Sequence, residues 1–310
     1  MDKKMLTRLS NEEALELLEQ IRWPNGPVCP HCGSSEHKAL NGAKCRPGLK
    51  QCKNKECRKQ YTVTVNTVME RSHLSAWQWV YLFARMSESK KGVSALQLSR
   101  ELGVTYKTAW FACHRVRYAM TEPTDGTKLG GPDKVVEADE AFHGGRPRFL
   151  HAYARVRDKV PVVTLVERGG KARSVVTNDV NSSTLRKHLT ANADAQSTLM
   201  TDSHSGYHSV GKHFAGHFTV NHAKSEYARK VKGGPTAHNN TAESYFSLFK
   251  RSVYGSFHHL SKEHLQRYMN ELDFRWNHRK MSDNERTMTA LAMSENKRLT
   301  YRNPKRPIQG

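Results

Sequence analysis

Apolar residues near the start of the chain recur at helical spacing: Ala14, Leu15, Leu17, Leu18 and Ile21. The preceding sequence, Ser10-Asn-Glu-Glu13, has the pattern of a capping box, in which each end residue's side chain accepts a hydrogen bond from the other's backbone N–H. A short amphipathic helix is therefore predicted here. Further on, YTVTVNTVME (61–70) alternates as a strand does, and the apolar segment LSAWQWVYLFARM (74–86) predicts a largely buried helix.

Residues 93–120 predict two helices joined by a tight turn at Gly103. The first is supported by apolar Ala95, Leu96, Leu98 and Leu102, and the second starts at Thr105. This pattern is typical of a helix-turn-helix, whose second helix enters the major groove of DNA. The candidate DNA-binding residues on that helix are Lys107, His114, Arg115 and Arg117. An ordinary helical hairpin that happens to be basic is the alternative.

A Gly-, Pro- and Asp-rich break at 122–134 predicts a domain boundary, beyond which the pattern changes to short β runs. Strands are predicted at 134–145, 160–170, 172–180, 197–207 and 217–223, with helices at 182–193 and 241–251. This order predicts an α/β domain with a mixed sheet.

Composition narrows the function. The 310 residues include 50 Lys and Arg against 29 Asp and Glu, which gives a net charge of +21, a pI near 9.8 and a mean hydropathy of −0.74. The chain contains no apolar run of the ~20 residues that a membrane span needs and no signal peptide at its start. We therefore expect a soluble cytoplasmic protein, not bound to a membrane, whose anionic partner is nucleic acid.

Four cysteines occur as two pairs, Cys29 with Cys32 in VCPHCG and Cys52 with Cys57 in QCKNKECRKQY. Two pairs on tight turns suit tetrahedral thiolate ligation of a structural Zn²⁺, and the segment has too few apolar residues for a core. Because the second pair has the less common C-x4-C spacing, Cys45 could replace one member. His31 is a spare candidate, and Cys113 is expected to be a small buried residue.

Three acidic residues stand out in the second half of the chain. Asp139 interrupts an apolar strand, where its charge needs compensation such as a bound cation. Asp202 ends a later strand, although it could simply initiate a turn. Glu243 shares a helix face with Lys250, seven residues on, although it could be a solvated surface charge. Three such carboxylates can bind two Mg²⁺ ions that clamp a phosphodiester, with Lys250 holding the phosphate.

With these residues the chain resembles the insertion-sequence transposases that are relatives of the eukaryotic Merlin elements. The resemblance runs from about residue 10 to about residue 280. The matching motifs are VCPHCG with QCKNKEC, VVEADEAFHGG, LMTDSHSGY, VNHAKSEYAR, HNNTAESYFSLFKRSVYGSFHHLS and HLQRYMNELDFRWNHR. The family implies a zinc ribbon, a helix-turn-helix and a ribonuclease-H-like catalytic domain with a DDE triad.

By that resemblance the triad is Asp139, Asp202 and Glu243, with Lys250 as the following basic residue. Asn240 could be a metal ligand beside or instead of Glu243, but the spacing to Lys250 favours Glu243. The implied activity is transposition in a bacterial cell, at the nucleoid. The protein would bind terminal inverted repeats and use two Mg²⁺ (or Mn²⁺) ions to cleave the transposon end and to join its 3′-OH to target DNA. A dimer or larger assembly would pair the two ends.

Two other functions remain open: an endonuclease or resolvase of the same fold, and a DNA-binding regulator with an inactive nuclease domain. The expected organisation is an N-terminal helix (1–25), the zinc ribbon (26–70), the helical DNA-binding region (71–121), the catalytic domain (134–280) and a basic C-terminal tail (281–310).

The net charge of +21 generates the first prediction. Affinity for non-specific duplex DNA should fall steeply with salt, because each neutralised phosphate releases counterions. Between 50 and 200 mM salt we expect a loss of about a thousandfold, in line with six or more phosphate contacts. Fluorescence anisotropy of a labelled duplex across that range measures the slope, and a salt-independent affinity would contradict a phosphate-binding surface.

Overall fold

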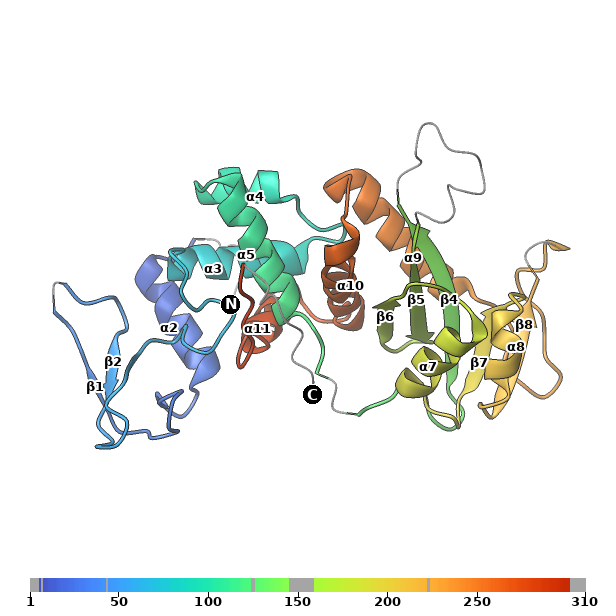
Figure 1. Ribbon diagram of the computed structural model, residues 1–310, viewed down its shortest axis with the longest axis horizontal. Coiled ribbons are helices and arrows are strands. Elements are labelled where there is room, and N and C mark those ends of the chain that lie inside the picture. Colours follow the sequence, from blue (N-terminus) through green and yellow to red (C-terminus); the bar gives the residue numbers. More distant parts are fainter. Residues whose placement is uncertain are drawn as a thin grey trace. The chain divides into compact units, whose positions relative to one another are not determined.

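The computed structural model describes residues 6, 8–42, 44–123, 126–144, 159–221 and 224–301 (Figure 1). The chain divides into two compact units, Met1–Thr121 with Lys280–Gly310, and Glu122–Arg279. The division at Glu122 falls at the start of the predicted Gly/Pro-rich break. No helix in the described part of the chain is long and apolar enough to cross a membrane.

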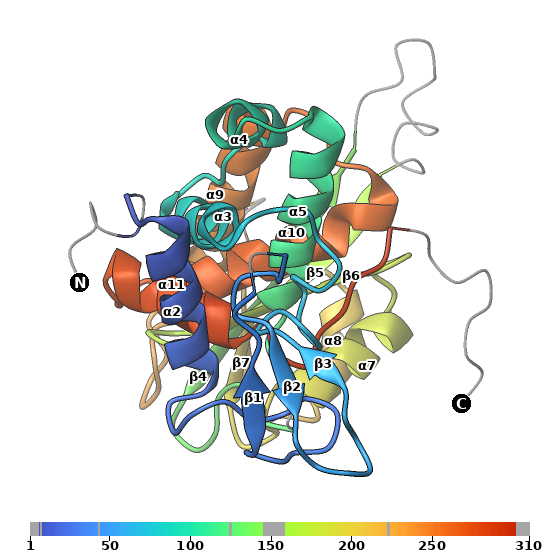
Figure 2. The same ribbon diagram turned by 90° about the vertical axis from the view of Figure 1, so that its left-hand side faces the viewer.

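The first unit begins with the predicted capped helix, α2 (Asn11–Arg22), in which Ser10 Oγ accepts from Glu13 N at 3.1 Å and Glu13 Oε2 accepts from Ser10 N at 2.6 Å. A small antiparallel sheet follows, formed by β1 (His37–Ala39), β2 (Lys50–Cys52) and β3 (Gln60–Tyr61) (Figure 2). The strand predicted at 61–70 is wrong beyond Tyr61. A turn begins there, in which Val65 N donates to Thr62 O at 3.2 Å, so the alternating side chains do not lie on a sheet.

Three helices complete the N-terminal part of this unit: α3 (Ala76–Glu88), α4 (Ala95–Leu102) and α5 (Tyr106–Ala119). Helix α3 is largely buried, as its apolar sequence predicts. Gly103 ends α4 with φ 66°, a left-handed conformation that glycine adopts without a steric cost, and α5 starts three residues later.

The segment expected to be a basic tail contains a helix, α11 (Asp283–Ala292), which packs against α2 and α3. The tail prediction is therefore wrong over these residues. A second capping box, formed by Ser282 and Glu285, starts the helix, and Thr287, Ala290 and Leu291 bury its inner face.

The second unit is built on a mixed five-stranded sheet, as predicted. Its strands are β4 (Val135–His143), β5 (Val160–Glu167), β6 (Ala172–Val176), β7 (Thr198–Asp202) and β8 (Gly216–Val220). Their order is β6-β5-β4-β7-β8, with antiparallel pairing from β6 to β4 and parallel pairing from β4 to β8.

Helices cover both faces of this sheet (Figure 1). On one face, α7 (Ser182–Asn192) and α8 (Gly206–Gly211) pack on Val136 and Ala138 of β4. On the other face, α9 (Asn240–Ser252) and α10 (Lys262–Asn277) pack on Ala141 of β4 and on apolar residues of β5. A π-helical turn, η2 (Val253–Phe257), follows α9. The alternation along β4 thus assigns Glu137 and Asp139 to the face that α9 covers.

A buried polar network holds α9 and α10 to β6. The Tyr245 hydroxyl donates to Asp273 Oδ1 at 2.5 Å and lies 2.7 Å from Ser174 Oγ. Asp273 also accepts from the Ser174 backbone N–H at 2.8 Å. Burial raises the pKa of Asp273 to about 6, while the hydrogen bonds from Tyr245 and Ser174 oppose that rise. The helix that carries Glu243 is therefore fixed to the sheet by more than apolar packing.

Candidate functional site

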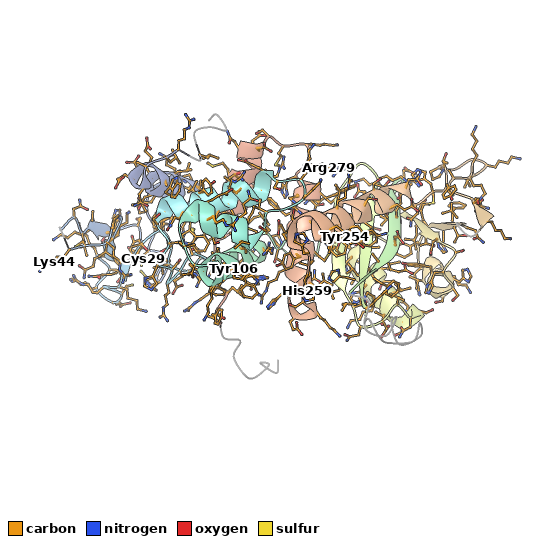
Figure 3. The ribbon with its side chains drawn as sticks, turned by 90° about the horizontal axis from the view of Figure 1, so that it is seen from above. Cys29, Lys44, Tyr106, Tyr254, His259 and Arg279 are labelled. Carbon is orange, nitrogen blue, oxygen red and sulfur yellow. The ribbon has the colours of Figure 1, made fainter. Side chains whose placement is uncertain are left out.

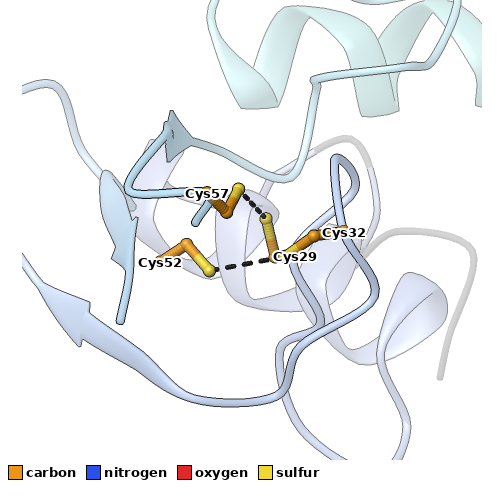
Figure 4. A group of neighbouring side chains, drawn as sticks. All are labelled: Cys29, Cys32, Cys52 and Cys57. Atoms are coloured by element: carbon orange, nitrogen blue, oxygen red, sulfur yellow. Dashed lines mark hydrogen bonds between the residues drawn. The ribbon is translucent and has the colours of Figure 1, made fainter. Parts of the chain in front are cut away.

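The four paired cysteines meet in the first unit, with their sulfur atoms all within 4.8 Å of one another (Figure 4). Cys29 Sγ lies 3.8 Å from Cys57 Sγ, and Cys32 Sγ lies 3.6 Å from Cys52 Sγ. Each close contact joins one member of the first pair to one member of the second. This arrangement supports a structural Zn²⁺ held by four thiolates.

Local backbone geometry turns the sulfur atoms inward. Cys29 O accepts from Gly33 N at 2.9 Å, and Gly33 has φ 76°, so the chain reverses tightly around the first pair. At the second pair, Cys57 N donates to Asn54 O at 3.1 Å. The C-x4-C spacing therefore closes a turn of its own without recruiting another cysteine.

The electrostatics of the cluster fit a cation. The backbone of Lys59 lowers the pKa of the Cys57 thiol. The backbone of Ser34 has the same effect on Cys32, but burial and the neighbouring thiols of Cys52, Cys57 and Cys29 outweigh it and raise the pKa of Cys32 to about 12. Four thiols this close cannot all ionise without a compensating positive charge, which zinc supplies.

The other candidate zinc ligands, Cys45 and His31, lie outside the cluster. Cys45 is exposed and is not a member of the cluster, so the suggestion that it replaces one of the four ligands is wrong. His31 is not a member either. Cys113 is fully buried in α5, as expected for a small apolar residue.

Two of the three predicted acids are carried by adjacent parallel strands. Asp139 lies on β4, and Asp202 is the last residue of β7. The paired stretch ends with Val136 opposite Leu199 and Glu137 opposite Met200, and Asp139 and Asp202 each follow that last pair by two residues. Glu243 lies in the first turn of α9, on the face of the sheet to which Asp139 points.

The charges of these acids interact. Burial raises the pKa of Asp139 to about 7, and the charges of Glu140, Asp202 and Glu243 add to this rise, while a 2.9 Å hydrogen bond from the Glu140 backbone N–H opposes it. The four cysteines are the one group of three or more potential ligands in the described residues that is close enough to hold a metal ion. Asp202 and Glu243 each act electrostatically on Asp139, but the three acids do not converge to that degree.

The structure adds Glu140 to this group of carboxylates. Glu140 was not among the residues predicted from the sequence. It lies on the opposite face of β4 from Asp139 and accepts from the Tyr207 hydroxyl at 2.6 Å. Burial raises the pKa of Glu140, and the charge of Asp202 adds to this rise. The hydrogen bond from Tyr207 opposes it. The adjacent acids Asp139 and Glu140 in VVEADEAF indicate this role in the sequence. Consecutive side chains of a buried strand lie on opposite faces, so both faces need a group that compensates a buried charge.

The two other predicted catalytic residues, Asn240 and Lys250, both lie exposed on α9. Asn240 is the first residue of the helix, and Lys250 is in its last turn, seven residues after Glu243. The helix was predicted at 241–251 and begins one residue earlier, so that it includes Asn240 as well as Glu243 and Lys250.

The predicted DNA-binding residues on α5 divide into two groups. His114 and Arg117 are buried, with 0% and 1% exposure, so neither can contact DNA in this conformation. Lys107 is exposed, and its ammonium group lies 5.1 Å from the ring centre of Tyr301. Arg115 is partly buried, stacks over Phe111 and donates to Glu70 O at 3.0 Å.

The exposed start of α5 is marked by Tyr106, which Figure 3 labels and which is 55% exposed. Lys107 and Arg115, together with Phe111 and Tyr301, line a cavity of about 290 Å³ in the first unit. Cationic groups and aromatic rings therefore occur together on the outer part of the helix.

Comparison with known proteins fits both sites. A transposase zinc-ribbon domain matches residues 9–60, and an ISXO2-like transposase domain matches residues 128–277. This chain belongs to the transposase family that these two domains describe. An uncharacterized protein in the transposable element ISH50 of Halobacterium salinarum is 29% identical over 290 residues, which cover 87% of this chain and 92% of that protein.

The domain matches assign the two candidate sites of this transposase to different parts of the family architecture. The four cysteines fall within the zinc-ribbon match, which supports a structural Zn²⁺. Asp139, Asp202 and Glu243 all fall within the transposase-domain match. Membership of this family also implies DNA as the partner.

The cysteine geometry generates a prediction for the transposase. The purified protein should carry about one Zn²⁺ per chain, and Cys29→Ser should lose the metal and unfold the ribbon, because zinc binding supplies its folding free energy. Metal analysis and amide exchange over 26–61 measure this. Cys45→Ser is the matched control and should retain full zinc. Equal zinc content in the two variants would contradict the assignment.

The raised pKa of Asp139 generates a prediction about stability. The folded-state pKa of about 7 lies above the 3.8 of an unperturbed aspartate, so the carboxyl destabilises the fold increasingly as pH rises towards and through 7. Without added divalent cations, the stability of Asp139→Asn relative to wild type should increase by about 1–2 kcal/mol between pH 5.5 and 8.

Chemical denaturation at the two pH values measures this difference. Asp133→Asn, which changes an exposed aspartate of the same unit, should show no such pH dependence. A pH-independent difference for Asp139→Asn would show that the carboxyl is not in a repulsive site.

Proposed function

We propose that this transposase binds the terminal inverted repeats of an insertion sequence and catalyses divalent-metal-dependent cleavage and strand transfer of DNA. The observation that carries this proposal is the site around Asp139. Burial raises the pKa of this carboxyl, and the charges of Glu140, Asp202 and Glu243 add to the rise; the carboxyl lies on a sheet within the transposase-domain match. Mutual repulsion of this kind favours the binding of a cation.

The residues at the site fit divalent metal. Asp139, Asp202 and Glu243 offer the hard oxygen ligands that Mg²⁺ or Mn²⁺ prefers, and a pair of such ions, when bound, activates water and stabilises the attacking and leaving oxygens of a phosphodiester. Lys250 would bind a DNA phosphate from its exposed position two turns along α9. The mixed sheet with helices on both faces supports a ribonuclease-H-like assignment of this unit.

For the third ligand we favour Glu243 over Asn240. Glu243 is one of the charged groups that raise the pKa of Asp139, after burial, Glu140 and Asp202. Asn240 is the first residue of α9, one turn earlier; both side chains are exposed, and the preference rests on the carboxylate of Glu243 and its spacing to Lys250.

For DNA recognition we propose that α4 and α5 form a helix-turn-helix. The left-handed turn at Gly103 and the exposed Lys107 support this proposal, with Arg115 as a second contact. His114 and Arg117 are left out because they are buried. Concerted cutting of two transposon ends requires a dimer or a larger assembly on DNA.

Replacing each proposed ligand by its amide tests the chemistry. We expect about a 100-fold or larger loss of Mg²⁺-dependent nicking of a labelled transposon end in each of Asp139→Asn, Asp202→Asn and Glu243→Gln. Each change removes several kcal/mol of transition-state stabilisation, and every 1.36 kcal/mol changes the rate tenfold. Asn240→Ala should retain most activity. DNA binding, measured in Ca²⁺, should be unchanged in all four variants.

Glu263→Gln is the matched control, because Glu263 lies in the first turn of α10 as Glu243 does in α9. Near-normal nicking by Glu243→Gln with an inactive Asn240→Ala would reverse the ligand assignment. Nicking that ignores the repeat sequence and gives no strand transfer would favour the endonuclease alternative. A wild-type protein that binds the repeats without nicking them would favour the regulator.

A further inference from the structure

Glu137 is a fully buried carboxylate to which the proposed chemistry gives no role. It lies on β4 two residues before Asp139, so both side chains lie on the sheet face that α9 covers. A buried charge is costly unless hydrogen bonds and an opposite charge compensate it. The partners of Glu137 therefore show what its charge is used for.

Those partners are the first turn of α9, one arginine and His238, whose Nδ1 lies 3.2 Å from Glu137 Oε1. Glu137 Oε2 accepts from Thr241 N at 2.8 Å and from Ala242 N at 3.0 Å. Its Oε1 accepts from Thr241 Oγ1 at 3.0 Å and from Arg168 Nε at 2.6 Å. The first amides of a helix have no acceptor within the helix, and Asn239, which precedes α9, makes no side-chain cap bond. Glu137 thus caps α9 from a neighbouring strand, where the helix dipole also favours a negative charge.

Arg168 fixes the residues that precede α9, by donating hydrogen bonds to their backbone carbonyl groups. Its Nη1 donates to Thr236 O at 2.9 Å and its Nη2 donates to His238 O at 2.9 Å. Its own backbone N–H donates to Val135 O on β4 at 3.0 Å. Asn239 adds a third connection, since its Nδ2 donates to Ala138 O at 3.3 Å. The segment 236–242 is therefore fixed to the part of β4 that leads into Asp139.

Glu243 is the residue that follows this fixed segment. Building on the function proposed above, we propose that Glu137, held by Arg168, is a positioning residue that sets the first turn of α9, and with it Glu243, against Asp139 for divalent-cation binding. A single strand then carries both a metal ligand and the anchor for the helix that bears another ligand. If Glu137 were only a structural ion pair, its loss would reduce stability and leave the response to metal unchanged.

The test measures metal binding without relying on catalysis. For the full chain, the rise in Tm with Mn²⁺ concentration gives the half-saturating concentration, because a ligand that binds the folded state stabilises it. Glu137→Gln should lower Tm and raise the half-saturating Mn²⁺ concentration about fivefold or more. Amide exchange at Thr241 and Ala242 should accelerate in the same variant.

Glu271→Gln is the matched control. Glu271 is equally buried and pairs with Arg275 at 2.7 Å on α10, in the same unit. This change should lower Tm and leave the half-saturating Mn²⁺ concentration unchanged. If Glu137→Gln does not fold, Arg168→Lys takes its place, because it keeps a cation beside Glu137 and loses the guanidinium bonds to Thr236 and His238. A rise in the half-saturating concentration is expected there too.

An unchanged Mn²⁺ response in the folded Glu137→Gln or Arg168→Lys protein would overturn the positioning role. Asp139→Asn separates this failure from failure of the proposed function. Loss of the Mn²⁺ response in Asp139→Asn, with a normal response in Glu137→Gln, would reject the inference alone. An unchanged response in Asp139→Asn would reject the metal site itself.

Discussion

The parallel pairing of β4 with β7 is the constraint on which the candidate catalytic site depends. It aligns two strands that are more than fifty residues apart in the sequence, and its last pair, Glu137 with Met200, comes two residues before Asp139 and Asp202. Parallel strands need a long crossover, which here contains β5, β6 and α7. Of those elements, β5 pairs with β4 and α7 packs on the sheet face of Val136 and Ala138, while α9 covers the opposite face, on which Asp139 lies.

The repulsion created by this pairing is balanced by fixed structure around it. Glu137 and Arg168 hold the start of α9, while Tyr245, Asp273 and Ser174 hold its middle to α10 and β6. A helix fixed at two places resists the movement that would carry Glu243 away from Asp139. The protein thus retains a group of carboxylates that costs stability in the folded chain, as sites that bind cations often do.

The cysteine cluster and the candidate carboxylate site place different demands on the fold. The cysteine cluster lies in a segment with a small three-stranded sheet, which offers little apolar surface for a core. A bound metal ion would therefore supply stability there. The carboxylate site is built on a five-stranded sheet with apolar clusters on both faces, and there the fold supplies the stability. The four cysteines already converge tightly, whereas the acids are linked through the electrostatic effect of Asp202 and Glu243 on Asp139.

The sequence alone determined the features that depend on local spacing. These include the capped helix at Ser10, the turn at Gly103, the two cysteine pairs, the alternation that puts Asp139 and Glu137 on one face of β4, and the placement of Glu243 and Lys250 on one helix. Only the tertiary structure decided which side of α5 is buried. His114 and Arg117 lie in the interior, although their residue types are typical of a DNA-binding surface. It also decided that α11 belongs to the first unit, and that Glu137 caps a helix more than one hundred residues away. Helical and strand periods are set by neighbouring residues, whereas burial and long-range hydrogen bonds are set by which elements pack together, and no single segment specifies that.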